Sequence, residues 1–202
     1  TVVAFAQLSP THAASATNLP SRLIEAAGLV EVLPGGRTNW ASAPVGLPLN
    51  AGDRVRTHAA SRAAVQLTDR SVIRLSERTT LEILPPRSAE KKRFGLPRGS
   101  IFFFNREKPT DIEFDTPLAA GAIRGTEFLL EVAETDSALR LGLIDGLVAL
   151  STAAGEVALE RGQELRLQPG QPPQKTALVN VAAAIQWALY YPAVLNPDDL
   201  GL

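Results

Sequence analysis

The feature that most constrains this chain is a long series of short apolar segments separated by turn residues, running from Ser21 to Leu167. Leu29–Leu33, Ser71–Leu75 and Ile112–Asp115 are typical, and the last alternates apolar and acidic residues. No stretch between the segments has the length and periodicity of a crossover helix, which disfavours a parallel sheet. A spacing of roughly 8–12 residues predicts an all-β chain, a sandwich or short β-solenoid-like domain of about ten to twelve short strands.

The amino-acid composition limits the kinds of ligand and partner that this chain can bind. The 202 residues are 45% hydrophobic and 20% charged, as in a globular protein. Their net charge of −1 disfavours nonspecific electrostatic binding to nucleic acid. The chain has no cysteine, which excludes a disulfide scaffold and cysteine-ligated zinc. No apolar run reaches the ~18 residues of a transmembrane helix. We therefore expect no cofactor and no transmembrane segment.

The first residues differ from the strand-rich middle. Residues 1–16 combine an apolar start, polar residues and the small-residue sequence Ala14-Ser15-Ala16. This order is typical of the end of a secretory signal peptide, although an ordinary amphipathic start of a domain is the alternative. We expect a signal-peptide remnant followed by a β domain over residues 17–170, in a protein exported to the periplasm or the cell exterior.

The C-terminal region has helical periodicity. Residues 171–179 include two adjacent prolines and are predicted to be a stiff linker. Residues 180–202 begin with an asparagine suited to a helix N-cap, and their apolar residues recur at helical spacing. Trp187, Tyr190 and Tyr191 lie off that apolar stripe and are candidates for an interface. Either the helix packs on the preceding domain, or it leads into a further module.

Several segments of the middle occur in a known order. The most specific are Gly52-Asp53-Arg54-Val55-Arg56-Thr57 and Ala122-Ile123-Arg124-Gly125-Thr126-Glu127-Phe128, and others are Ser61–Leu67, Asp69–Leu75, Leu96–Phe102 and Phe114–Pro117. Together they resemble the extracytoplasmic FecR-type domain, named for the regulator of ferric-citrate uptake. The resemblance covers roughly Gly28 to Gly170.

This resemblance implies an all-β, non-enzymatic domain outside the cytoplasm. In the best-known members the domain is the periplasmic arm of a membrane-bound anti-sigma factor. Here a signal-like start directly precedes the β domain, and the C-terminal region resembles the junction to tetratricopeptide-type helical repeats in exported proteins. We therefore expect a binding, signalling or scaffold module that acts through protein–protein contacts at the cell envelope. The alternative is a structural subunit of an envelope assembly or extracellular filament.

One motif arginine stands among apolar residues. Arg124 is either exposed at a bend or buried with an acidic partner, for which Asp53 and Glu127 are the candidates, with Arg56 nearby. The buried arrangement would be a polar latch that fixes strand register. The exposed arrangement would be a recognition loop for a partner.

The carboxylates of one segment share a face. Asp111, Glu113 and Asp115 alternate along a predicted strand, which places them on the same side. They are candidates for a hard-cation site such as Ca²⁺, or they form a solvated face with Ile112 and Phe114 pointing inward. We expect the solvated face and no metal.

Basic residues gather in the segment Glu90-Lys91-Lys92-Arg93, with Arg87 and Arg98 nearby. Lys91, Lys92 and Arg93 are predicted to form a basic hairpin tip, which either contacts an anionic polymer or lipid headgroups, or is a solvated loop. We expect the solvated loop, because the rest of the chain balances the charge.

Catalytic signatures are missing from the sequence. A histidine-based hydrolase would have to use His58, because His12 lies in the predicted leader, and no G-x-S-x-G elbow is present. There is also no phosphate-binding loop and no dinucleotide-binding glycine pattern. We therefore predict that the chain is not an enzyme.

Overall fold

The computed structural model describes residues 20–87, 91–105, 109–178 and 186–188. These residues form a 15-stranded sheet, and the only helical residues among them are 186–188. The predicted all-β class is confirmed. The strand count exceeds the expected ten to twelve because two strands of two residues and one exposed polar strand, at residues 174–177, leave no apolar pattern in the sequence.

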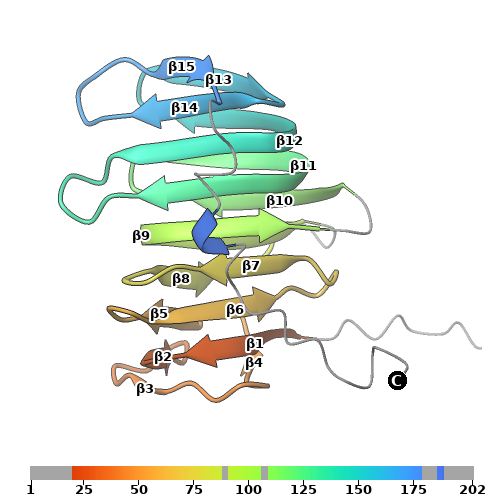
Figure 1. Cartoon of the computed structure of the whole chain (residues 1–202), viewed down its shortest axis with the longest axis vertical. Coiled ribbons are helices and arrows are strands. Elements are labelled where there is room, and N and C mark those ends of the chain that lie inside the picture. Colours follow the sequence, from red (N-terminus) through yellow and green to blue (C-terminus); the bar gives the residue numbers. More distant parts are fainter. Residues whose placement is uncertain (1–19, 88–90, 106–108, 179–185, 189–202) are drawn as a thin grey trace, which may run out of the picture.

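The sheet folds over itself into two layers (Figure 1). Three long strands belong to both layers, β9 (Lys92–Phe104), β11 (Ala119–Val132) and β12 (Leu139–Thr152). The front layer also contains β1 (Ser21–Ala27), β4 (Pro48–Leu49), β6 (Arg62–Gln66), β7 (Val72–Leu75), β14 (Gln163–Leu167) and β15 (Gln174–Ala177). The back layer also contains β2 (Val30–Leu33), β3 (Ala41–Ser42), β5 (Arg54–Thr57), β8 (Thr80–Ile83), β10 (Thr110–Asp115) and β13 (Gly155–Glu160).

Each long strand bends between its two halves, and this bend, or corner, takes the chain from one layer into the other. The first half of β9 pairs with β8 and β10 in the back layer, and its second half pairs with β7 and β11 in the front layer. One consequence is the parallel pairing of β9 and β10, because the chain completes one coil before β10 begins. The other pairings among the described strands are antiparallel. The solenoid-like expectation therefore describes this coil, and the sandwich expectation describes the two facing layers.

Glycine is required where β11 and β12 turn the corner. Gly125 and Gly146 face each other in the ladder, beside a register shift between Gly125 and Glu127. A Cβ on Gly125 would lie 2.6 Å from the carbonyl oxygen of Asp145. A Cβ on Gly146, whose φ is 127°, would lie 2.5 Å from the Cα of Gly125. Only two glycines let the backbones approach this closely at the bulge.

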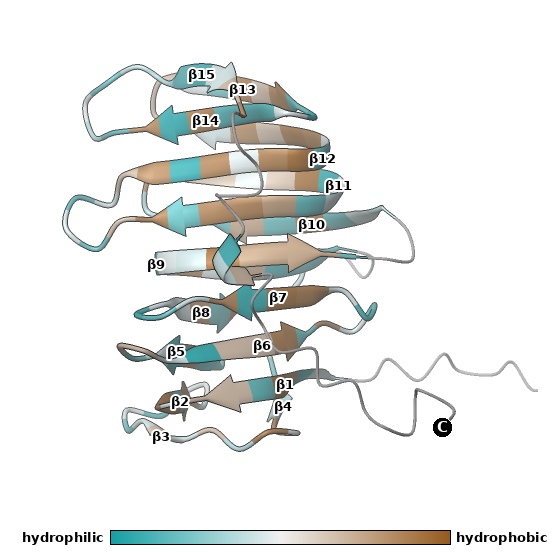
Figure 2. Ribbon diagram, viewed as in Figure 1, coloured by the Kyte–Doolittle hydropathy of each residue, from teal (hydrophilic) through white to brown (hydrophobic). Residues whose placement is uncertain are grey.

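One hydrophobic core fills the space between the layers. Aromatic pairs stack across neighbouring strands, Phe94 on Phe114 at 6.1 Å and Phe103 on Phe128 at 4.8 Å between ring centroids. Strand residues alternate between this core and the outside, and Figure 2 shows the alternation as brown and teal along β12 and β14. The predicted inward positions of Ile112 and Phe114 are confirmed, since both are buried.

The C-terminal part of the described chain differs from the expectation. Residues 171–179, predicted as a linker, contain β15, which pairs with β14 and extends the front layer. The sheet therefore continues past residue 170. No helix within the described ranges is long and apolar enough to cross a membrane.

Candidate functional site

The first motif, Gly52–Thr57, begins with a carboxylate that ties two turns together. Asp53 is buried, and its two oxygens accept hydrogen bonds from the backbone N–H groups of Gly35 and Asn50, each at 2.8 Å. Both carboxylate oxygens of Asp53 thus accept hydrogen bonds from backbone groups of the turns beside it. The motif aspartate is a structural anchor.

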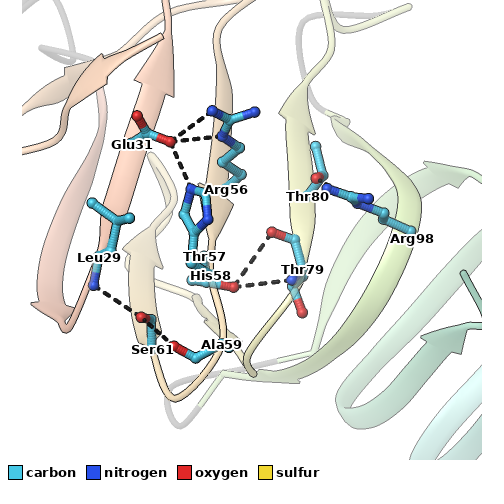
Figure 3. A network of polar contacts seen from close by, with 10 residues as sticks. All are labelled: Leu29, Glu31, Arg56, Thr57, His58, Ala59, Ser61, Thr79, Thr80 and Arg98. Atoms are coloured by element: carbon cyan, nitrogen blue, oxygen red, sulfur yellow. Dashed lines mark hydrogen bonds and ion pairs between the residues drawn. The ribbon is translucent and has the colours of Figure 1, made fainter.

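Arg56 of the same motif belongs to a charged cluster on the back layer, shown in Figure 3. Arg56 on β5 faces Glu31 on β2, with Nη2 at 2.7 Å from Glu31 Oε2, and His58 Nε2 lies 2.6 Å from the same oxygen. The guanidinium also lies over the ring of Trp40 at 4.0 Å. The hydrogen bond with His58, followed by that with Arg56, lowers the pKa of Glu31.

The hydroxyl groups around this cluster serve the backbone. The Thr57 hydroxyl donates to the carbonyl of Ser76 at 2.6 Å and accepts from the N–H of Thr79 at 3.0 Å. The Ser61 hydroxyl accepts from the N–H of Leu29 at 2.9 Å, as Figure 3 shows. The hydroxyl groups of Thr57 and Ser61 are therefore engaged with backbone groups of the turns next to them.

The second motif, Ala122–Phe128, places its arginine differently. Arg124 lies exposed on β11, between Asp111 of β10 and Leu147 of β12, immediately before the corner at Gly125. It has no ion-pair partner within the described ranges. The structure therefore places Arg124 exposed at a bend, which was one of the two expectations.

The predicted latch is not assembled from its four residues. Asp53 and Arg56 are engaged in the separate contacts described above. Glu127 lies half-buried at the register shift of β11, opposite Phe104 of β9. Register at the corner is instead set by the glycine pair and the bulge.

An open groove of about 400 Å³ runs beside Arg124 on the outer face of the back layer. Its floor includes three exposed alanines that are neighbours across β11, β12 and β13, namely Ala122, Ala149 and Ala158. Leu147, which is 61% exposed, lines it beside Arg124. Small residues leave a shallow trough, and the exposed leucine adds an apolar contact point.

This groove was not identified from the sequence, although a signal for it exists. Within Leu147-Val148-Ala149-Leu150, Val148 and Leu150 point into the core, so strand alternation sends Leu147 and Ala149 outward. The pairing that aligns Ala122 with Ala149 depends on the bulge, which the pattern of one strand does not reveal.

The carboxylates of β10 are held by cations. Glu113 lies 3.4 Å from Lys91 Nζ, and Asp115 pairs with Arg93. Asp111 is exposed beside Arg124. Across the described ranges no three His, Asp or Glu side chains are grouped so as to hold a metal ion. Asp111 is therefore exposed as expected of a solvated face, whereas Glu113 and Asp115 are partly buried and paired with cations.

The basic residues do not form a free hairpin tip. Lys92 and Arg93 begin β9, and Lys91 directly precedes it. Lys92 Nζ lies 4.0 Å from Asp69, and all three side chains are partly buried. The prediction of a solvated loop is therefore wrong for these three residues. Their side chains lie against the sheet because they pair with Glu113, Asp69 and Asp115.

The C-terminal residues that are described pack on the front layer. Ala188 is buried against Phe102, and the partly buried Phe104, Ile144 and Trp187 complete this second apolar cluster. Of the two expectations for this region, packing on the preceding domain is observed for residues 186–188. Tyr190 and Tyr191 lie outside the described residues.

Comparisons with known proteins agree with this architecture. The profile described as FecR protein matches residues 53–149. Two crystal structures described as an anti-sigma factor from Parabacteroides distasonis superpose with TM-scores of 0.54 and 0.52, at 15% and 16% sequence identity. Each match covers 61% of this chain and 59% of the other, so the chain spans about three fifths of the solved proteins. No curated protein matches.

The family match includes most of both motifs, from Asp53 in the first to Phe128 in the second. At 15–16% identity, the structural likeness demonstrates a shared fold. The region from 53 to 149 therefore matches the FecR protein family, and its fold is shared with proteins described as anti-sigma factors.

Proposed function

We propose that this chain is a non-enzymatic binding module that acts in signalling or as a scaffold, through protein–protein contacts, outside the cytoplasm at the bacterial cell envelope. The match to the FecR family supports a regulatory role. The signal-like residues 1–16 support export. The working surface we assign to it is the groove beside Arg124.

A single observation carries this assignment. Arg124 is the one arginine of the two motifs that the described fold does not use, whereas Arg54 pairs with Glu82 and Arg56 with Glu31. Arginine is one of the residue types enriched at interface hot spots, and the exposed leucine beside Arg124 adds apolar surface that a partner can cover. An aligned row of alanines lets a partner approach the sheet closely.

The alternative, a subunit of a filament, would use the open edges of the sheet at its two ends. At one end the edge strand β4 has two residues and begins with Pro48, which has no N–H to donate. At the other end Lys175 of β15 donates to the carbonyl of Ala158 on β13 at 3.2 Å. Short strands, proline and lysine are the features by which proteins block edge-to-edge pairing. These features favour the binding module over the filament.

Affinity capture from the envelope fraction of the source cells tests the proposal. We would compare the full chain with Arg124→Glu and Leu147→Asp, using Arg37→Glu and Val45→Asp as matched controls. Leu147 and Val45 are equally exposed, at 61%, and Arg37 is exposed on a turn away from the groove.

We expect a protein that is retained by the wild type and both controls and lost by both groove variants, with all five proteins equally stable. Retention of the same proteins by every variant would refute the groove as the working surface. A regular polymer in negative stain, still formed by the groove variants, would instead support the filament.

A further inference from the structure

A second hollow lies at one side opening between the two layers, away from Arg124. Its volume is about 270 Å³, and it is lined where β4, β6 and β8 end and β9 begins. Its apolar wall includes Leu49, Leu67 and Ile83, all buried at the margin of the core. This hollow is therefore an opening into the hydrophobic interior.

The other wall of this hollow is cationic. Lys91, Lys92 and Arg93 line it, and among the described residues none that lines it is an aspartate or glutamate. The carboxylates that pair with these cations, Glu113, Asp69 and Asp115, are not among the lining residues. They hold the cations in place without closing the hollow.

One hydrogen-bond donor at this wall is unsatisfied. Arg93 is 83% buried, its Nη2 donates to Asp115, and its Nε is buried with no hydrogen-bond partner in the described part of the chain. A buried donor without a partner is costly, so an acceptor that Arg93 could reach by a shift of its side chain would be favoured. Lys92, at 4.0 Å from Asp69, keeps donors for a further acceptor.

We propose that this hollow binds a small anionic amphiphile, with one short alkyl chain against Leu49, Leu67 and Ile83 and the anionic headgroup on Lys92 and Arg93. The volume sets the size, because pockets for drug-sized ligands begin at about 300 Å³. A single chain fits, and a diacyl lipid does not. The hollow and the groove beside Arg124 share Lys91, but the contacts proposed here, with Lys92, Arg93 and the apolar wall, belong to the hollow alone. The proposal does not depend on the function proposed for the groove.

Titration of the full chain with octanoate and with octyl phosphate, followed by amide chemical shifts, tests the site and separates a carboxylate from a phosphate headgroup. We expect shifts at Leu49, Leu67 and Ile83 with at least one of the two probes. Because each buried methylene improves affinity by up to about fourfold, octanoate should bind at least about tenfold tighter than butanoate. The neutral analogue octanol should bind at least about tenfold more weakly than octanoate.

Two kinds of variant locate the site. The double variant Lys92→Gln with Arg93→Gln should weaken octanoate binding at least about tenfold, whereas Arg98→Gln with Lys175→Gln, which removes the same charges elsewhere, should not. Ala51→Phe adds bulk to the lining while leaving every charge in place and should also abolish binding. Melting curves of all variants report whether each is folded.

The proposal fails if neither probe binds, if octanol binds as tightly as octanoate, or if both double variants weaken binding equally. It also fails if the shifts map to Arg124 and Leu147 instead. If the Lys92 and Arg93 variant does not fold, Ala51→Phe alone decides between the two results.

Discussion

The two motif segments of this chain have similar composition, but the fold uses their side chains differently. Gly52–Thr57 and Ala122–Phe128 each contain arginine, threonine, an acidic residue and glycine. In the first, the fold uses the side chains of Asp53 and Thr57 in hydrogen bonds to neighbouring turns, and that of Arg56 in an ion pair with β2. In the second, the fold uses the glycine and leaves Arg124 exposed. A family-type motif can therefore contain residues that the fold requires and, beside them, an exposed residue that the fold does not require.

Gly125→Ala should have the largest effect of any change in the two motifs. The added Cβ would meet the carbonyl oxygen of Asp145 at 2.6 Å, so the corner must open. We expect a loss of about 3 kcal/mol in the free energy of unfolding, measured with urea. Gly36→Ala is the control, because its Cβ would meet no atom within 4 Å and only its φ of 74° carries a cost, about 1 kcal/mol. Equal losses for the two would mean that close approach does not matter at this corner.

Asp53→Ala tests the structural role of the first motif. It leaves the N–H groups of Gly35 and Asn50 without their acceptor, and we expect a loss of about 2 kcal/mol in unfolding free energy. Asp136→Ala removes a similar carboxylate-to-amide bond, to Ala138, at an exposed turn and should cost about 0.5 kcal/mol. If Asp53→Ala were as mild as Asp136→Ala, the first motif would need another explanation.

Glu31→Gln tests the charged cluster through pH. Contacts with His58 and Arg56 lower the pKa of Glu31 in the folded state below its ordinary 4.5. The ionised carboxylate therefore adds stability above that value, and this contribution is lost as the pH falls through the folded-state pKa. Wild type should be more stable than Glu31→Gln at neutral pH, and the gap should close in acid. Urea unfolding at several pH values measures it, with Glu134→Gln, an exposed carboxylate, as the control. A gap independent of pH would contradict the role of ionisation.

Arg124→Ala should have the smallest effect on stability. An exposed side chain without an ion-pair partner in the described residues should contribute within about 0.5 kcal/mol, so the melting temperature should move by only about 1–2 °C. A buried latch would instead lose more than about 2 kcal/mol. A large shift here would remove the contrast between the two motifs and return Arg124 to the fold.

Much of the fold could be predicted from local pattern. Alternation placed Ile112 and Phe114 in the core, and short segments between turns defined an all-β chain. The two-residue strands β3 and β4 could not be found, since so few residues carry no periodicity. The strand within residues 174–177 was missed because QKTA is polar on every side and lies at an open edge, where neither face is buried.

The candidate surfaces depended on pairing between distant segments. The sequence singled out Arg124 as a candidate, but the acidic partners predicted for it are not the residues beside it. Asp53 and Glu127 were reasonable by charge, yet the sheet register puts Arg124 beside Asp111 and Leu147. The same register places Lys91 beside Glu113 and Arg93 beside Asp115. These basic residues were predicted to lie in a solvated loop and are instead partly buried.

The sequence by itself determined that this chain forms strands rather than helices between residues 21 and 167, and which residues point inward in strands with clear alternation, such as Ile112 and Phe114. These properties follow from the conformational preferences of single residues and from a two-residue repeat. Only the tertiary structure decided which strand lies beside which, and so which side chains share a surface. Pairing depends on the corner at Gly125 and Gly146, where a bulge shifts the register, and no local pattern contains both sides of that contact.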